Sequence, residues 1–153
     1  LYRDFGNLAY KISDYLRLRG FETLVAHPHE ETIDFSHLTL KAGMGAIGKS
    51  RLLISPEIGP NQKIAAILVN IKNLPVAESN LYEWIPDYCN YCSSCVRACP
   101  HDALVLDKKT RTVSFVEELC IGCSEGCTEC IQVRPFYKKG YDAIFEKYKK
   151  MSL

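Results

Sequence analysis

The stretch CNYCSSCVRACP, residues 89–100, carries four cysteines at a 2-2-3 spacing and ends in proline. This spacing wraps three thiolates around one iron–sulfur cluster, while the fourth cysteine turns away and binds a second cluster. Thiolates are soft anionic donors that suit iron. Two Cys-x-x-Cys pairs would also satisfy zinc, but the trailing proline and the 2-2-3 spacing favour iron–sulfur. The four cysteines are Cys89, Cys92, Cys95 and Cys99.

A second group of cysteines, with irregular spacing, lies further along the chain. Its end reads Cys127-x-x-Cys130-x-x-x-Arg134-Pro135, which is the tail of a cluster motif with Arg134 where the last cysteine would stand. Because that cysteine normally serves the first cluster, the fourth ligand of the first cluster is in question. The second group comprises Cys120, Cys123, Cys127 and Cys130.

Several ligand assignments stay open at this point. Cys123 replaces the missing ligand and gives two complete 4Fe–4S clusters, or the first site holds a 3Fe–4S cluster, or a cube there has a non-cysteine ligand. The register set by Pro135 favours a second cluster on Cys99, Cys120, Cys127 and Cys130. The rival assignment gives the second cluster Cys99, Cys120, Cys123 and Cys127, with Cys130 crossing to the first.

The composition narrows the class of protein. The 153 residues are 47% hydrophobic and 24% charged with a net charge of +1, which is typical of a globular protein and gives no global field for nucleic acid or membrane. All eight cysteines lie between residues 89 and 130, whereas a disulfide framework usually spreads along the whole chain. The least polar stretch, residues 63–71, is far shorter than the roughly 20 residues of a membrane helix, and no signal peptide is visible. We therefore expect bound metal, no membrane association and a cytoplasmic location.

The glycine stretch GMGAIGKS, residues 43–50, matches both the P-loop and the dinucleotide fingerprint. Both motifs need a strand before the loop and a helix after it. Here the residues before the loop have a helical pattern, and prolines at 56 and 60 interrupt the segment after it. The stretch is therefore interpreted as a glycine-permitted turn between a helix and a strand.

Hydrophobic periodicity and the cysteine motifs together predict an α+β chain in two parts: periodicity indicates an α/β portion over residues 1–83, and the cysteine motifs indicate a ferredoxin-like module with a C-terminal helix over residues 84–153. In the first predicted helix, Phe5, Leu8, Ile12, Tyr15 and Leu16 share one face. The run at 63–71 has the continuous apolar pattern of a central strand buried on both sides. Helices are predicted at 2–19, 37–42 (capped by Ser36) and 141–150, and strands at 21–26, 51–55 and 63–71.

Three stretches together resemble one known group of proteins. KAGMGAIGKSRLLISPEIGP at 41–60, CNYCSSCVRACPHDAL at 89–104 and GCTECIQVRPF at 126–136 are similar, in order and in motif, to the epoxyqueuosine reductase and reductive dehalogenase family. The resemblance covers most of residues 1–140.

The resemblance implies a cobalamin-binding, nitroreductase-like α/β domain fused to a two-cluster ferredoxin module. Electrons would pass from a donor protein through both clusters to cobalt, which then reduces a small-molecule substrate, or a tRNA in the case of epoxyqueuosine reductases. The resemblance also implies that the glycine stretch, residues 43–50, is a loop of the corrinoid domain and binds the cofactor. The alternative is a non-catalytic ferredoxin-like electron carrier that serves a partner enzyme. The cofactor-binding residues of the loop would be Gly43, Gly45, Gly48 and Lys49.

The chain departs from the family pattern in three ways. Family members carry an additional N-terminal segment that completes the α/β domain, whereas this sequence starts late in that domain, at Leu1; we expect an upstream segment. The epoxyqueuosine enzymes place a proton-donating Asp in the stretch that matches AHPHEE, residues 26–31, which has none here, and this argues against epoxyqueuosine as the substrate. Arg134 replaces a cluster cysteine, and a guanidinium beside a cluster is expected to raise its reduction potential because reduction adds negative charge.

Overall fold

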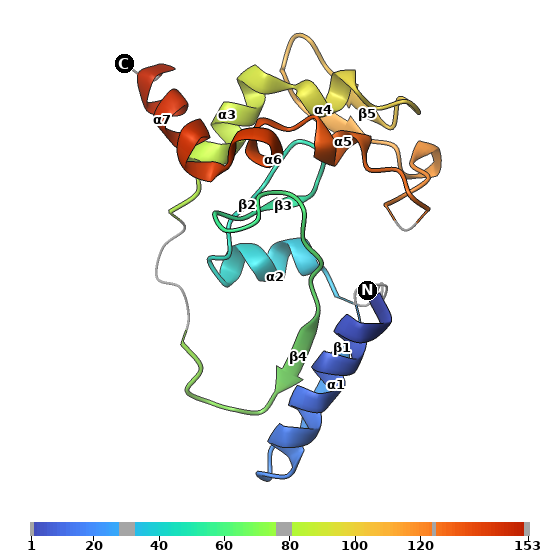
Figure 1. Ribbon diagram of the computed structural model, residues 1–153, viewed down its shortest axis with the longest axis vertical. Helices are drawn as coiled ribbons and strands as arrows, with labels where there is room; N and C mark the ends of the chain where they lie inside the picture. The colour runs from blue at the N-terminus through green and yellow to red at the C-terminus, as the bar shows by residue number, and fades with distance from the viewer. Residues whose placement is uncertain (1, 28–32, 76–80, 124, 152–153) are drawn as a thin grey trace.

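The computed structural model describes residues 2–27, 33–75, 81–123 and 125–151 (Figure 1). Its strands pair into three two-stranded antiparallel sheets, β1–β4, β2–β3 and β5–β6. The helices are α1 (Tyr2–Arg17), α2 (Phe35–Lys41), α3 (Trp84–Cys92), α4 (Ser94–Arg97), α5 (Glu129–Gln132), α6 (Pro135–Lys139) and α7 (Tyr141–Met151), with a 3-10 turn, η1, at Glu117–Leu119. The strands are β1 (Thr23–Ala26), β2 (Ala46–Ile47), β3 (Leu53–Ile54), β4 (Ala66–Val69), β5 (Leu104–Leu106) and β6 (Val113–Phe115).

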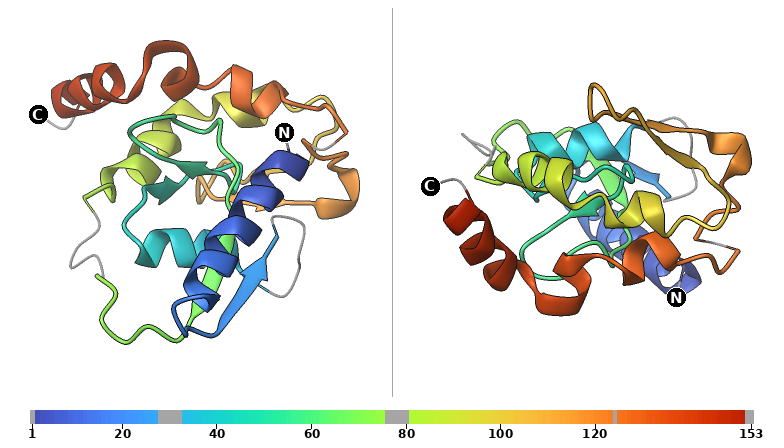
Figure 2. Two further views of the ribbon diagram at one scale, coloured as in Figure 1. Left: turned by 60° about the horizontal axis from the view of Figure 1, so that its bottom comes forward. Right: turned by 90° about the horizontal axis from the view of Figure 1, so that it is seen from above.

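Helix α1 packs on the β1–β4 pair through its smallest side chains (Figure 2). Ala9 and Ser13 are buried, and the Ser13 hydroxyl lies 2.6 Å from the Thr23 hydroxyl of β1. The predicted apolar face is largely on the outside instead: Leu8 and Ile12 are about half exposed. That prediction of the buried face was wrong, because small residues allow the helix and the strands to approach closely.

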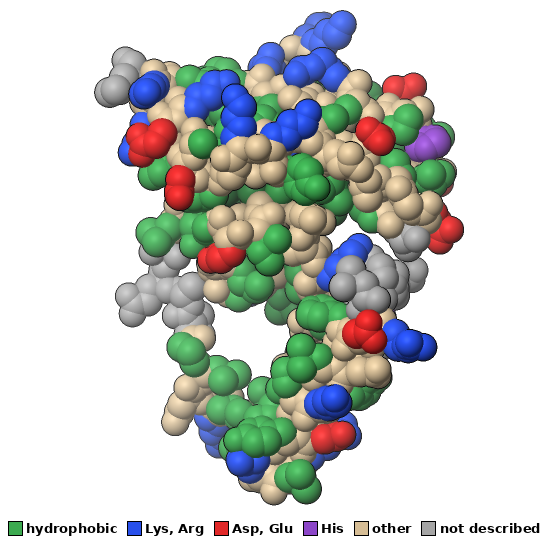
Figure 3. Space-filling view, viewed as in Figure 1, with side chains coloured by type: hydrophobic (Ala, Val, Ile, Leu, Met, Phe, Trp, Pro, Cys, Tyr) green, Lys and Arg blue, Asp and Glu red, His purple; other side chains and the backbone are tan. Residues whose placement is uncertain are grey.

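Strand β4 is not the central strand that its apolar run predicts. Among the described residues it pairs with β1 alone, in the register Thr23↔Val69 to Ala26↔Ala66. The outward-facing Leu24 and Leu68 are 63% and 45% exposed, and Figure 3 shows hydrophobic side chains on this lower part of the molecule.

The glycine stretch begins with the predicted turn between a helix and a strand, which joins α2 to β2, and continues through β2 into the turn of the β2–β3 hairpin. Helix α2 is capped by Asp34 rather than by Ser36, because the Asp34 carboxylate accepts the backbone N–H of His37 at 3.0 Å. A helix precedes the loop and a strand follows it, whereas a P-loop follows a strand and precedes a helix.

The main core joins the two halves of the sequence. Ala46 and Ile54 of the β2–β3 hairpin pack with Trp84 of α3, Phe136 of α6 and Ile144 of α7. The indole ring of Trp84 is surrounded by aromatic rings, the nearest with centroids 4.9 and 5.2 Å away. The hairpin is therefore anchored in the part of the chain that carries the cysteines.

No helix in the described part of the chain is both long and apolar enough to cross a membrane.

Candidate metal centres

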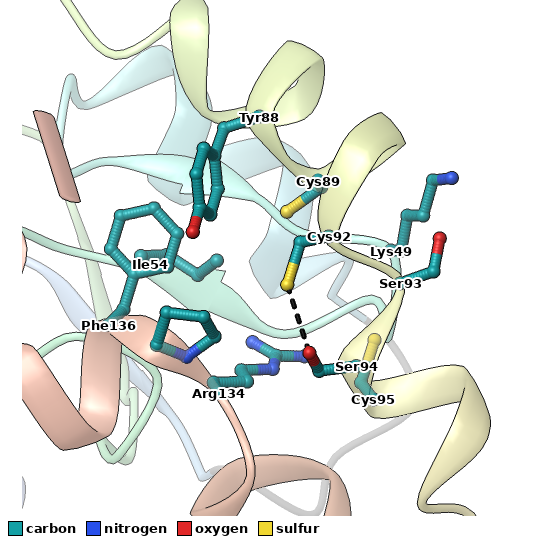
Figure 4. A pocket seen from close by; sticks show the side chains of 11 residues that line it. Lys49, Ile54, Tyr88, Cys89, Cys92, Ser93, Ser94, Cys95, Arg134 and Phe136 are labelled. Carbon is teal, nitrogen blue, oxygen red and sulfur yellow. Dashed lines mark hydrogen bonds between the residues drawn. The ribbon is translucent and has the colours of Figure 1, made fainter. Parts of the chain in front are cut away.

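Three cysteines of the first motif line one cavity, here called the first cavity (Figure 4). Helix α3 supplies Cys89 and Cys92, and α4 supplies Cys95. Ser93 joins the two helices in the left-handed conformation, φ 45° and ψ 22°, so that the chain turns and the three thiols face the same space. The hydroxyl of Ser94 lies 3.1 Å from the Cys92 sulfur, within hydrogen-bonding distance.

Arg134 closes the same cavity from the opposite side. It stands immediately before Pro135, which begins α6, and has the extended backbone (φ −71°, ψ 138°) favoured before proline. The side chain is only 4% exposed, and neither Nη1 nor Nη2 has a hydrogen-bond partner among the described residues. Arg134 thus lies where the register of the second motif places the missing cysteine.

The glycine loop forms a wall of the first cavity. A Cβ added at Gly48 would lie 3.5 Å from Arg134 Nη1 and 3.6 Å from Cys89 Sγ. The backbone N–H of Lys49 donates to the Cys89 thiol. The Lys49 ammonium points elsewhere and donates to the carbonyl of Arg111 at 2.8 Å.

Burial dominates the electrostatics of this cavity. It raises the pKa of the Cys89 thiol, and the hydrogen bond from Lys49 and the charge of Arg134 partly offset the rise. Burial also lowers the pKa of Lys49, helped by the nearby Arg111 and opposed by the cysteines. Metal binding would require these thiols to be deprotonated.

The five other cysteines line a second cavity. Cys99 follows α4, Cys120 follows η1, and Cys130 lies in α5. Cys120 is exposed, while the others are partly buried. The five are Cys99, Cys120, Cys123, Cys127 and Cys130.

The two cavities are neighbours. Helices α4 and α5, which supply Cys95 to the first and Cys130 to the second, pack against each other. The pKa of Cys130 is raised to about 11, chiefly by burial; the positive charge of Arg134 opposes the rise, and Cys123 and Cys95 contribute to it. One guanidinium therefore acts on thiols of both cavities.

All eight predicted cysteines are free thiols, in two sets of three and five. Cys123 lines the second cavity rather than the first. Within the described ranges no three His, Cys, Asp or Glu side chains converge closely enough to hold a single metal ion.

Of the predicted cofactor-binding residues, Gly48 and Lys49 lie at the first cavity, and Gly45 packs against Ile54. Gly43 has a φ of 64° in the turn after α2. The stretch without an Asp, 26–31, falls mostly on residues 28–32, outside the described residues. Sequence reasoning missed Ser94, whose only signal was a small polar residue between two cysteines.

Comparisons with known proteins identify an iron–sulfur motif at the first group of cysteines. The family model described as a 4Fe-4S binding domain matches residues 82–105. A tetrachloroethene reductive dehalogenase of Desulfitobacterium hafniense is 27% identical over 112 residues, 73% of this chain and 20% of the relative. An epoxyqueuosine reductase of Listeria monocytogenes is 31% identical over 121 residues, 70% of this chain and 30% of the relative.

The fold has a counterpart among solved structures. A catabolic reductive dehalogenase superposes with a TM-score of 0.64 at 18% identity, over 90% of this chain and 21% of that chain. The chain thus spans about a fifth to a third of the length of the two curated relatives.

Proposed function

Because this chain belongs to the iron–sulfur family of the epoxyqueuosine reductases and reductive dehalogenases, we propose that it carries electrons through two iron–sulfur clusters to a reductase site. The observation that supports this most directly is the sorting of eight free cysteines into two adjacent cavities. An iron–sulfur cluster, when bound, takes up and releases an electron at a potential set by its ligands, hydrogen bonds and solvent exposure.

We assign the first cluster to Cys89, Cys92 and Cys95. The second takes Cys99, Cys120, Cys127 and Cys130. This leaves Cys123 as a fifth thiol of the second cavity that is not needed as a ligand. The rival assignment gives Cys130 to the first cluster. The electrostatic interaction of Cys130 with Cys95, which lines the first cavity, supports this alternative.

The exposure of the thiols supports a direction for electron flow. Cys120 is exposed, so a donor protein can approach the second cavity, whereas Cys95 is buried in the first. Electrons would therefore enter at the second cluster and leave from the first. The charge of Arg134, which lines the first cavity, would favour movement of electrons toward it.

The reductase site would belong to the portion over residues 1–83, in a nitroreductase-like domain, and use a corrinoid. The contact of the glycine loop with the first cavity supports this, because a cofactor held on the loop's other side would lie near the first cluster. We propose that the chain divides by function between residues 83 and 84. The β2–β3 hairpin forms the contact between the two parts.

The second candidate is an electron carrier that serves a separate enzyme. Gly45 favours it: a Cβ there would lie 2.1 Å from the Ile54 carbonyl oxygen, so the chain's own packing explains this glycine without a cofactor. Cobalamin distinguishes the two candidates. Protein incubated with cob(II)alamin and passed over a sizing column retains the pigment in the first case and loses it in the second.

Cysteine variants test the cluster assignment. Anaerobically purified protein should show a broad visible absorbance that dithionite bleaches. Cys92→Ser should abolish the first cluster and Cys99→Ser the second, each with loss of about half of the bound iron. The matched control, Cys123→Ser, should keep the iron content of the wild type. A colourless protein with stoichiometric zinc would refute the proposal, and loss of iron in Cys123→Ser would refute the assignment.

A further inference from the structure

Arg134 is a buried charge without a partner in the described part of the chain. Among those residues, both terminal nitrogens of its guanidinium lack a hydrogen-bond partner, and the side chain is 4% exposed. A buried, unpaired charge is strongly unfavourable unless something compensates it. The guanidinium faces the space lined by Cys89, Cys92 and Cys95, so an anionic group in that space would supply the missing acceptors.

Arginine cannot stand in for the cysteine as a ligand to iron. The guanidinium has five N–H donors, offers no lone pair and stays protonated in proteins. Cys123, the thiol that could have replaced the missing cysteine of the first cavity, lines the second cavity instead. The hydroxyl of Ser94 is already engaged with Cys92, and that of Ser93 points away from Arg134 (Figure 4). The first cavity therefore offers three thiolates and a hydrogen-bond donor.

We propose that this cavity is a three-iron site: Cys89, Cys92 and Cys95 bind a 3Fe–4S cluster, and Arg134 donates its N–H groups to the sulfides at the corner that lacks iron. The inference rests on the proposed function, since it needs a cluster in the first cavity. Sulfides that bridge fewer irons are electron-rich acceptors, and charge-assisted hydrogen bonds to them satisfy the guanidinium. The same positive charge stabilises the reduced state, so the first cluster holds electrons more firmly than a four-thiolate cube would.

The deciding variant is Arg134→Cys, which restores a thiol in front of Pro135. Anaerobically purified wild-type protein should contain roughly seven irons per chain and show the 3Fe–4S EPR signal when oxidised, whereas the variant should contain roughly eight and lose that signal. The control is Arg3→Cys, which adds a thiol on the exposed side of α1 and should behave as the wild type. Wild-type protein with two four-iron clusters and no three-iron signal overturns the inference.

A second pair of variants tests the role of the guanidinium even if Arg134→Cys does not fold. Arg134→Lys keeps the charge and Arg134→Gln removes it, and both leave three thiolates in place. Both should keep the three-iron signal, and Arg134→Gln should lower the midpoint potential of the first cluster in an EPR-monitored redox titration. An unchanged potential overturns the role given to Arg134.

Failure of the inference can be told apart from failure of the proposed function. Cys92→Ser removes the first cluster and should leave the signal of the second four-iron cluster unchanged. A wild-type protein with no cluster signal at all refutes both proposals. A protein with two four-iron clusters refutes only the three-iron site, and whichever of Cys123→Ser and Cys130→Ser loses the signal of the first cluster while keeping that of the second would then identify the fourth ligand.

Discussion

Gly45 has a position that no other residue type can occupy without moving the backbone. Its φ is +152°, and an added Cβ would lie 2.1 Å from the carbonyl oxygen of Ile54 across the β2–β3 hairpin. Gly45→Ala should therefore lower the free energy of unfolding by at least about 3 kcal/mol, because strain and a clash with backbone act together.

Gly20→Ala is the matched control for this prediction. Gly20 has a φ of +85°, but among the described residues, its own chain neighbours aside, nothing lies within 4 Å of an added Cβ, so only the conformational cost of about 1 kcal/mol remains. Urea denaturation of both variants measures the difference. Equal losses of stability would show that the contact with Ile54 does not constrain Gly45.

The cysteines that line the two cavities could be identified one by one from the sequence because cluster motifs are defined by spacing along the chain, and their role as ligands stays a prediction. The 2-2-3 motif identified the cysteines of the first cavity, and the Pro135 register placed Arg134 opposite them. The position of Cys123 was not predictable, because the path of the loop between η1 and α5 determines which cavity a thiol enters. Spacing alone does not determine that path.

At the scale of elements, the packing of α3 against α6 and α7 depends on one aromatic side chain. Trp84 contacts the rings of Phe136, Tyr141 and Phe145, and its indole N–H donates to the Tyr141 hydroxyl at 3.1 Å. Trp84→Ala should cost about 3–5 kcal/mol, because it leaves a large cavity in this core.

Tyr137→Ala provides the comparison, since Tyr137 lies on α6 with its side chain 48% exposed. This change should alter stability by less than about 0.5 kcal/mol. Chemical denaturation monitored by far-ultraviolet circular dichroism reports both values. A cost for Trp84→Ala below about 1 kcal/mol would mean that the aromatic cluster repacks.

Element types and their approximate limits followed from periodicity, whereas element partners did not. The helices at 2–19 and 141–150 were predicted close to α1 and α7. The burial of β4 was wrong, because an apolar run indicates a strand but does not say how many neighbours it has. The buried face of α1 was wrong because close packing on β1 selects small side chains such as Ala9 over larger apolar ones.

For the whole molecule, the concentration of all eight cysteines in the C-terminal half predicts a local response to loss of metal. Removal of iron with a chelator should raise amide exchange rates by about tenfold or more over residues 84–139, since metal binding and folding are coupled. Exchange in α1, β1 and β4, which pack on one another, should not change.

Hydrogen exchange followed by mass spectrometry measures this response. The control is the double variant Cys92→Ser/Cys99→Ser under the same chelator, in which both clusters are already lost and no further change is expected. A uniform loss of protection over all described segments would show that the molecule responds as a single cooperative unit.

The main core, which joins the two halves of the sequence, also affects when the first cavity can receive iron during synthesis of the protein. Ala46 and Ile54 leave the ribosome long before Trp84, and the first three thiols leave before Phe136 and Ile144, which complete the core around them. Until α7 has been synthesised, Cys89, Cys92 and Cys95 have neither Arg134 nor α7 to shield them from water and oxidants. A chain terminated before Arg134 would therefore carry thiols that no folded cavity protects, and the closed first cavity is available only after α7 has been synthesised.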